Sequence, residues 1–216
     1  RGKQKRQAFS EVVEVMGGDR QRAQQLVEQN PIVLTSARVT RAFEDLVSAV
    51  TAGDKEAARQ LVEQEPHLLR SAQITTVVAF LVTEVMGGDR ERALRLVEQS
   101  PSMLTSKSIK QAWAELCDEV MEGDKARALQ LVEQHPALLI TKQAPAAFAF
   151  LVSEVMGGDR ERALKLVKQS PQMLTSKCIK QAWAELCDEV MEGDKDRARQ
   201  LVEQNPLVLS SKRVAS

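Results

Sequence analysis

Apolar side chains recur along this chain at helical spacing, in stripes that alternate between a longer and a shorter form. The segment 107–141 contains one stripe of each kind. Its longer stripe consists of Ile109, Ala112, Trp113, Leu116, Cys117, Val120 and Met121. Its shorter stripe consists of Ala128, Leu131 and Val132. Steps of three and four residues place each set on one face of a helix, so the segment predicts a first helix of about 15 residues and then a second, shorter one.

Residues at the ends of these stripes predict where each helix begins and ends. Ser106 is expected to cap the first helix, and Gly123 to end it in a left-handed conformation. Asp124 is expected to cap the second helix, because its carboxylate can accept the free N–H groups of the first turn. Pro136 then halts that helix or opens a short new turn. Pro145, in the first turn of the next helix, is expected to delay that helix and bend the stack locally.

This pair of helices recurs six times at a constant step of 35 residues. The capping aspartates are Asp19, Asp54, Asp89, Asp124, Asp159 and Asp194, and the prolines are Pro31, Pro66, Pro101, Pro136, Pro171 and Pro206. A strict period of this length is typical of stacked helical hairpins, and the alternation that marks strands is missing from the sequence. We therefore predict an all-α fold, a right-handed α-solenoid of six 35-residue helix-turn-helix repeats.

The repeats divide the chain into consecutive segments, which we number 1 to 6. They span approximately residues 2–36, 37–71, 72–106, 107–141, 142–176 and 177–211. Because each repeat buries its apolar face only against its neighbours, we expect a single helical-repeat domain over residues 1–216. The chain starts without methionine, and the pattern of a further first helix begins at Ser211, so we expect a fragment of a longer array.

A second period of 70 residues lies on top of the first, because residues 84–135 and 154–205 match at nearly every position. Odd-numbered repeats carry Gly-Gly before the capping aspartate. Even-numbered repeats replace the first of these glycines by Ala52, Glu122 or Glu192. We therefore expect the exposed surfaces of neighbouring repeats to alternate.

Composition narrows the class of protein. Lys plus Arg equals Asp plus Glu at 30 each, so the chain lacks the basic excess that is typical of nucleic-acid binding. No apolar run in the sequence approaches the roughly 18 residues that span a bilayer, so no membrane partner is expected. Three cysteines without disulfide or zinc spacing indicate a reducing compartment, and we expect a cytoplasmic protein.

The helix pair of repeat 4 resembles a tetratricopeptide repeat. The residues that carry the resemblance are Trp113, Leu116, Cys117, Val120, Gly123, Asp124, Ala128 and Val132. That family has Trp, Leu, a small residue and an aromatic in its first helix, then Gly-Asp, then Ala in its second. Here the first helix is one residue shorter before the glycine, and the proline arrives several residues early. The resemblance implies a divergent tetratricopeptide-like α-solenoid that binds proteins.

If this correspondence holds, one face of the first helices lines a groove for a peptide. In repeats 4 and 6 that face consists of Gln111, Ala114, Asp118, Glu122, Gln181, Ala184, Asp188 and Glu192. Within each set the residues lie three or four positions apart, which places them on one side of a helix. The carboxylates suit a peptide that bears Lys or Arg. The alternative is a solvated surface whose carboxylates pair with Lys and Arg across the turn.

A ladder of positive charge stands at the start of the second helices. We name it the basic ladder, and it consists of Arg20, Arg22, Lys55, Arg90, Arg92, Lys125, Arg127, Arg160, Arg162, Lys195 and Arg197. Positive charge there opposes the helix macrodipole, so a phosphate backbone is an alternative ligand. A weaker resemblance supports it, because the Pro-x-x-Leu turn at residues 31–34 is similar to that of mitochondrial transcription termination factor repeats, which bind nucleic acid. Interleaved Glu91, Glu161 and Asp196 favour ion pairs between repeats instead.

The remaining chemical groups fit a packed core. Residues on the apolar stripes, expected to pack rather than react, are Met16, Met86, Met121, Met156, Met191, Trp113, Trp183, Cys117 and Cys187. Cys178 is expected to be more exposed. His67 and His135 occupy different places in their repeats, so no metal or acid–base site recurs. We expect no catalytic residue, no metal and no cofactor.

The leading hypothesis is a non-catalytic scaffold that binds a protein or peptide along the concave surface of its first helices. One alternative is a nucleic-acid-binding array that uses the basic ladder. The other is a structural spacer that self-associates end to end, because the terminal repeats show no evident polar cap.

Overall fold

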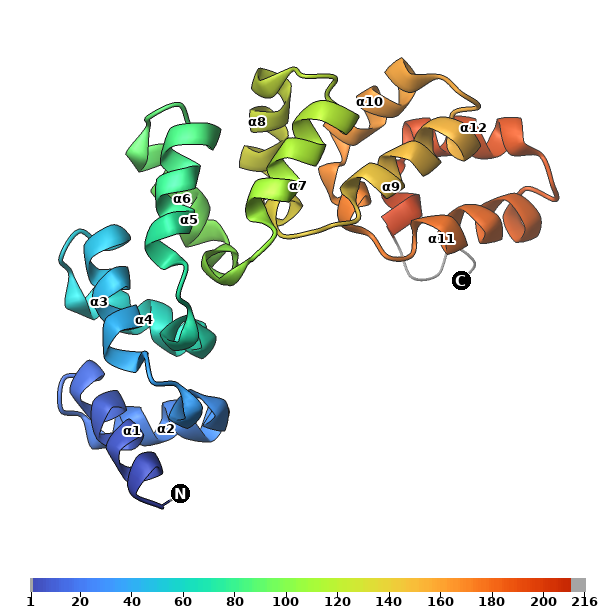
Figure 1. The fold of residues 1–216 in the computed structure, drawn as a ribbon. Helices are drawn as coiled ribbons and strands as arrows, with labels where there is room; N and C mark the ends of the chain where they lie inside the picture. The colour runs from blue at the N-terminus through green and yellow to red at the C-terminus, as the bar shows by residue number, and fades with distance from the viewer. Residues whose placement is uncertain (1, 211–216) are drawn as a thin grey trace. The chain divides into compact units, whose positions relative to one another are not determined.

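The computed structural model describes residues 2–210 (Figure 1). Over this range the chain forms twelve α-helices in six pairs, linked by short 3-10 and π segments, and contains no strand. The predicted all-α array of 35-residue helix pairs is confirmed. The further first helix expected from Ser211 lies outside the described residues. Every helix between residues 2 and 210 falls short of the length and apolar character that crossing a bilayer requires.

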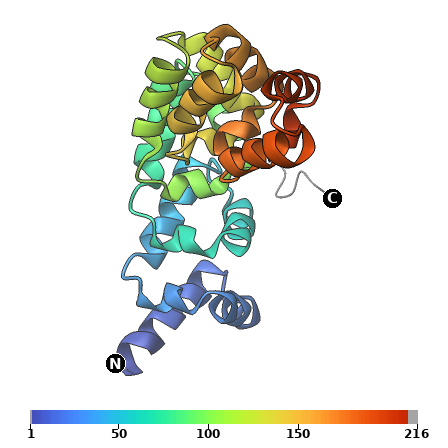
Figure 2. The same cartoon turned by 90° about the vertical axis from the view of Figure 1, so that its right-hand side faces the viewer.

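Contacts divide the chain into two compact parts, and Arg1–Lys107 holds repeats 1 to 3. Its elements are α1 (Gly2–Val15), α2 (Arg20–Gln29), η1 (Pro31–Thr35), α3 (Val39–Ala49), α4 (Lys55–Gln64), η2 (Pro66–Arg70), α5 (Ile74–Phe80), η3 (Leu81–Val85), α6 (Arg90–Gln99) and η4 (Pro101–Thr105). The first helices α1, α3 and α5 pack against one another in turn, as Figures 1 and 2 show. The proline turns η1, η2 and η4 form a second stacked row.

The other compact part, Ser108–Ser216, holds repeats 4 to 6. Its elements are α7 (Ile109–Glu115), η5 (Leu116–Val120), α8 (Lys125–Gln134), η6 (Pro136–Leu139), α9 (Ala144–Phe150), η7 (Leu151–Val155), α10 (Arg160–Gln169), η8 (Pro171–Thr175), α11 (Ile179–Glu185), η9 (Leu186–Val190), α12 (Lys195–Gln204) and η10 (Pro206–Ser210). Helix α9 packs against α7 and η5, and the proline turns η6, η8 and η10 stack in order. Each part therefore grows by the same local contacts.

The second helices begin and end as predicted. In repeat 1, Oδ1 of Asp19 accepts the backbone N–H groups of Gln21 and Arg22 at 2.9 and 3.0 Å. The other five aspartates also cap their helices: Asp54 and Asp194 accept two backbone N–H groups, and Asp89, Asp124 and Asp159 accept one. Each helix stops two residues before its proline, which then opens a 3-10 turn at a position that needs no N–H donor.

The predicted start of the first helices is wrong by two residues. Ser106 ends the 3-10 turn η4, and α7 begins only at Ile109. The equivalent Ser71 shows what this position does. Its hydroxyl donates to the carbonyl oxygen of Leu104 at 2.9 Å and accepts from the N–H of Gln73 at 3.2 Å. A side chain engaged between consecutive proline turns is not available to cap the helix that follows.

The first helices of repeats 3 to 6 end in a π segment, which the sequence did not reveal. In repeat 4 the N–H of Met121 donates to the carbonyl of Leu116, five residues earlier, at 3.0 Å. Around this wider turn Leu116, Cys117, Val120 and Met121 are all buried. Gly123 then takes the predicted left-handed conformation, with φ 87°.

The predicted core residues are buried, with one exception at the end of the array. Met16, Met86, Met121, Met156, Trp113, Trp183, Cys117 and Cys187 are buried, whereas Met191 is half-buried. Cys178 is half-buried, as expected. The predicted delay of the helix at Pro145 is wrong, because α9 begins at Ala144, in register with the other first helices. Pro145 fits the first turn without loss, since the N–H groups there have no partner within the helix.

Candidate functional site

The candidate groove residues of repeats 4 and 6 are exposed, and the glutamines among them are tied to their own helices. Gln111 donates from Nε2 to Oε1 of Glu115 at 2.6 Å. Gln181 makes the same bond to Glu185 at 2.7 Å. Asp118 lies exposed one turn further on, and within the described residues no cationic side chain hydrogen-bonds or pairs with it.

Glu122 and Glu192 do not belong to the same helical face as the rest of the predicted groove. The first helix of repeat 4 ends at Val120, and Glu122 follows in the left-handed conformation with φ 53°. Glu192 has the same conformation, with φ 52°. The three-and-four spacing placed them on one face only for a helix that continued to residue 122. The prediction of one shared face is therefore wrong for these two residues.

Glu122 instead joins repeat 4 to repeat 5. Its Oε1 lies 2.8 Å from Nε of Arg160, an ion pair without an aligned hydrogen bond. The Nη2 of Arg160 donates to the carbonyl oxygens of Glu119 and Val120 at 2.8 and 3.0 Å. Its guanidinium also lies 4.7 Å from the ring centre of Phe148. One member of the basic ladder thus neutralises the C-terminal end of the preceding first helix.

Other arginines of the basic ladder join neighbouring second helices. Arg22 contacts Glu56 at 3.0 Å and Glu63 at 2.7 Å. Arg162 donates from Nε to Oε1 of Glu203 at 2.7 Å. Hydrogen bonds from these arginines hold the pKa values of the Glu56 and Glu203 carboxyls below their usual range, and the carboxylates raise the pKa of both arginines. The interpretation of the basic ladder as ion pairs between repeats fits these members.

The rest of the basic ladder divides between bound and solvent-facing groups. Arg90 donates from Nη2 to the carbonyl of Ala49 at 2.7 Å, and the Arg20 guanidinium lies 5.7 Å from the ring centre of Phe9. Arg92 is half-buried. The members that are exposed and form no side-chain pair within the described residues are Lys55, Lys125, Lys195 and Arg197. Arg127 pairs with Asp124, the capping residue of its own helix, and lines a pocket between α8 and α10.

Two arginines outside the basic ladder also donate to backbone carbonyls of the preceding repeat, as Arg160 does. Arg59 donates from Nε to the carbonyl of Val15 at 2.9 Å, and Arg199 to that of Val155 at 2.8 Å. Both approach the end of the first helix in the preceding odd-numbered repeat. The sequence held a signal for them, because only repeats 2 and 6 carry arginine at this position and both follow a Gly-Gly repeat.

The thiols and the imidazoles form no reactive cluster. Burial, with the Asp118 charge beside it, raises the pKa of the Cys117 thiol to about 11, so this thiol is protonated at neutral pH. His135 lies 3.2 Å from Thr175 Oγ1, and burial lowers its pKa. Within residues 2–210, no three His, Cys, Asp or Glu side chains converge in a way that would hold a metal ion.

Comparison with known proteins assigns this chain to no family, so its class is described by its fold alone. No protein-family model matches the chain, and no curated protein matches it. The findings support a regular array of helix pairs with proline turns and a period of about 35 residues.

Proposed function

We propose that this chain is a non-catalytic scaffold that binds a basic protein segment along the exposed face of its first helices in repeats 4 and 6. The observation that carries the proposal is the contrast between the two kinds of charge. Asp118 and Asp188 are exposed carboxylates without a cationic partner in the described chain. Four of the eight arginines of the basic ladder, in contrast, are engaged in contacts between repeats, namely Arg22, Arg90, Arg160 and Arg162.

The acidic surface of each of these repeats is local and well defined. Asp118 and Glu119 are both exposed, and Asp188 and Glu189 repeat them 70 residues later. A lysine or arginine side chain of a partner can meet one such pair without displacing an existing ion pair. Complementary charge of this kind steers association and selects among partners.

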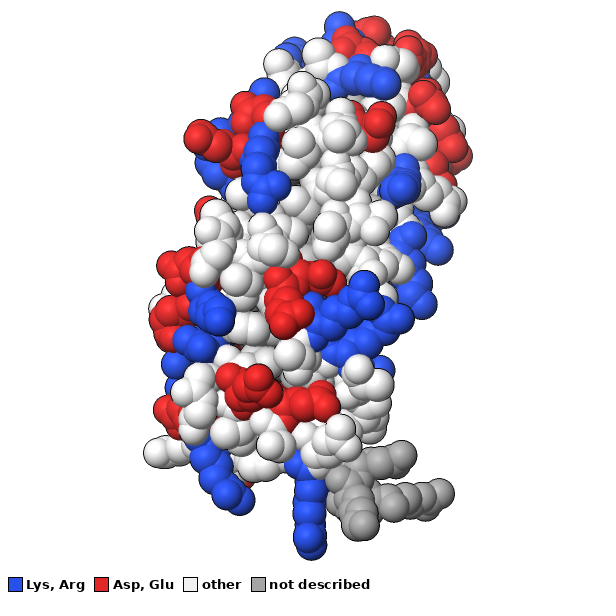
Figure 3. All heavy atoms as spheres, turned by 60° about the vertical axis from the view of Figure 1, so that its left-hand side comes forward, with Lys and Arg blue, Asp and Glu red and all other residues white. Residues whose placement is uncertain are grey.

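A nucleic-acid-binding function is less well supported. Binding to a phosphate backbone needs a continuous row of free cations. On the face drawn in Figure 3, Lys and Arg side chains are interspersed with Asp and Glu in small groups. The arginines that repeat most regularly are also those that hold neighbouring helices together.

End-to-end self-association is also less well supported, because the two ends of the array differ. Gln7 and Glu11 of repeat 1 occupy positions where repeat 5 buries Ala147 and Leu151. Repeat 1 therefore presents polar side chains at two positions that are apolar and buried in repeat 5. At the other end Val190 is 42% exposed. A contact between unlike ends would place this apolar surface against a polar one.

The test is a binding assay with peptides of opposite charge. We expect fluorescein-labelled Lys/Arg-rich peptides to bind the chain more tightly than their Gln-substituted versions at low salt. The double variant Asp118→Asn, Asp188→Asn should weaken binding about tenfold, the effect of losing two exposed ion pairs of about 0.7 kcal/mol each. The matched control is Glu91→Gln with Glu98→Gln, which removes the same charge from the exposed face of α6. Equal weakening by both double variants would contradict the proposed surface.

A further inference from the structure

One position changes from glutamate to lysine in a single repeat, and the ion pairs of the other repeats show what this change removes. The residue three positions before each repeat's proline is lysine in repeat 5, at Lys168. In the other five repeats it is glutamate, at Glu28, Glu63, Glu98, Glu133 and Glu203. Two of these glutamates are the partners of ladder arginines in the preceding repeat, in the pairs Arg22–Glu63 and Arg162–Glu203. Each pair spans 41 residues. A break at this position therefore removes a contact between second helices.

At the junction between α8 and α10 the same two positions hold Arg127 and Lys168. Two cations thus replace the arginine–glutamate pair. Arg127 turns to its own capping residue, with Nε 3.2 Å from Oδ2 of Asp124, and its side chain remains 62% exposed. Lys168 is exposed, and the described residues offer it neither a hydrogen bond nor an ion pair. Of the two cations at this junction, Arg127 shares its charge with Asp124, whereas Lys168 pairs with no carboxylate among the described residues.

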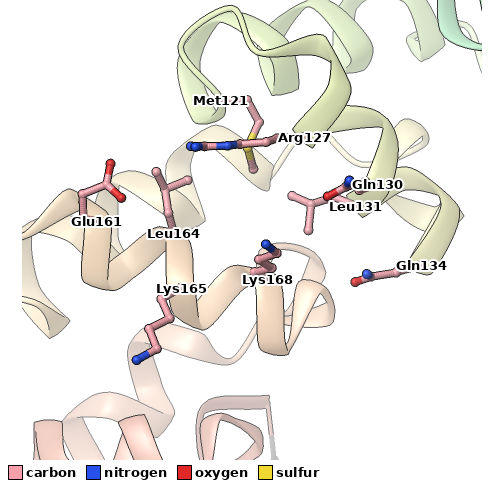
Figure 4. A pocket seen from close by; sticks show the side chains of 9 residues that line it. All are labelled: Met121, Arg127, Gln130, Leu131, Gln134, Glu161, Leu164, Lys165 and Lys168. Atoms are coloured by element: carbon pink, nitrogen blue, oxygen red, sulfur yellow. The ribbon is translucent and has the colours of Figure 1, made fainter.

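The same junction is hollowed by a pocket of about 230 Å³. Its base is apolar, formed by the buried Met121 and Leu131 and by the half-buried Leu164. Figure 4 shows Arg127 reaching across from α8 and Lys168 pointing into the space between the two helices, whereas Lys165 points away from it. The pocket therefore combines an apolar base with a cationic rim.

We propose that this pocket binds an acidic peptide segment, with an apolar side chain on Met121, Leu131 and Leu164 and an adjacent carboxylate between Arg127 and Lys168. The volume suits one medium-sized side chain and its neighbour, since sites for larger ligands measure roughly 300–1,000 Å³. An apolar contact joined to a charge pair is a common way in which proteins read short segments. The site lies mainly on second helices, with Met121 from the end of the first helix, and does not depend on the proposed binding surface of Asp118 and Asp188.

A peptide carboxylate fits this site better than nucleic acid does. Arg127 and Lys168 meet at this one junction, and Glu161 lines the same pocket. At the next junction the equivalent positions are occupied by the closed pair Arg162–Glu203. A phosphate backbone would have to continue past these carboxylates, whereas a single Asp or Glu side chain ends at the pocket.

The test uses the whole chain and three pools of fluorescein-labelled octapeptides. Each pool carries Leu, Ile, Val, Met or Phe at one position, followed by Asp/Glu, by Asn/Gln or by Lys/Arg. We expect the acidic pool to bind most tightly. Lys168→Glu should weaken its binding by about tenfold or more, because the new carboxylate pairs with Arg127 and repels the ligand. Lys168→Gln should weaken the binding of the acidic pool less, since glutamine removes one positive charge but forms no ion pair with Arg127. Lys168→Glu is expected to fold, because five repeats carry glutamate at this position.

The control is Lys177→Glu, an equal change of charge at an exposed residue outside the pocket, and it should leave binding within about twofold of the unaltered chain. Three results would overturn the proposal. One is equal binding of the acidic and amide pools, or no binding of either at about 1 mM. The second is unchanged binding by Lys168→Glu. The third is binding of a single-stranded RNA that Lys168→Glu abolishes while the acidic pool stays unbound.

Discussion

Gly17 lies directly against the guanidinium of Arg59, the residue that closes the end of the preceding first helix. A Cβ at Gly17 would stand 3.1 Å from Cζ of Arg59. Gly157 and Arg199 repeat the relationship, with a Cβ 3.2 Å from Nη2. The first glycine of these Gly-Gly turns therefore serves two needs at once, the left-handed backbone and the space for an arginine from the next repeat.

Gly17→Ala should destabilise repeats 1 and 2 more than Gly87→Ala destabilises its own repeat. Both glycines have positive φ, 72° and 59°, so either alanine costs about 1–2 kcal/mol of backbone strain. A Cβ at Gly87, however, meets no atom within 4 Å, whereas one at Gly17 crowds the Arg59 guanidinium, which must shift by a few tenths of an ångström and so strains its bond to Val15. We expect an additional loss of about 0.5–1 kcal/mol at Gly17. Hydrogen exchange of backbone amides measures it locally, and equal losses at both sites would speak against the dual role.

The Arg162–Glu203 pair should make stability depend on pH in the acidic range. The folded chain lowers the pKa of Glu203, so the stabilisation is complete above the unfolded pKa and disappears as pH falls through the lower folded value. Glu203→Gln should therefore cost up to about 1 kcal/mol at neutral pH and nothing at low pH, since pairs this exposed are worth little. Urea unfolding of both proteins at several pH values checks this. A cost that stays constant down to low pH would show that the charge of Glu203 plays no part.

Much of the fold follows from the sequence because the informative residues act locally. Asp124 caps a helix through its own next turn, and Pro136 limits a helix through its missing N–H. The start of the first helix was mispredicted because the hydroxyl of Ser71, the counterpart of Ser106, bonds to Leu104, 33 residues away. A pattern of residues close together in the sequence does not predict a hydrogen-bond partner this far along the chain.

The candidate site was less predictable than the fold, because it too depends on contacts between repeats. A face drawn at helical spacing assumed that the helix continues to Glu122, but the π segment and the left-handed turn remove this residue from it. The contact between Glu122 and Arg160 joins two repeats, and helical spacing within one repeat carries no information about it. Lys168 was readable in principle, because it breaks an otherwise constant column of glutamates, but its meaning required the position of Arg127.

The three thiols should react at two distinct rates. Cys178 is half-buried, whereas Cys117 and Cys187 are buried and burial raises the pKa of both. A disulfide reagent at neutral pH should modify one thiol per chain quickly and the other two only when the array opens. Cys178→Ser should remove the fast phase. A fast phase that survives this substitution would place the reactive thiol elsewhere.

Lys168→Glu should stabilise repeats 4 to 6 in the absence of any ligand. The new carboxylate would face Arg127 as Glu203 faces Arg162, and it would relieve the repulsion between two cations. The expected gain is about 0.2–1 kcal/mol at low salt, shrinking as salt is added. Lys177→Glu, with the same change of charge, should give no such gain in thermal unfolding. A gain of equal size in both variants would point to overall charge rather than to this junction.

Glu122 and Glu192 offer a matched measurement of one contact between repeats. Both adopt the left-handed conformation in the same Met-Glu-Gly-Asp turn, so Glu→Gly relieves strain at either site, offset in part by the greater freedom of the unfolded chain. Only Glu122 forms an ion pair within the described residues, with Arg160. Glu192→Gly should therefore be neutral or stabilising by up to about 1 kcal/mol, and Glu122→Gly less favourable by about 0.2–1 kcal/mol. Hydrogen exchange of the amides at the start of α8 and α12 gives both values. Because the two turns share their sequence, identical shifts would mean that the Glu122–Arg160 pair contributes nothing to the junction.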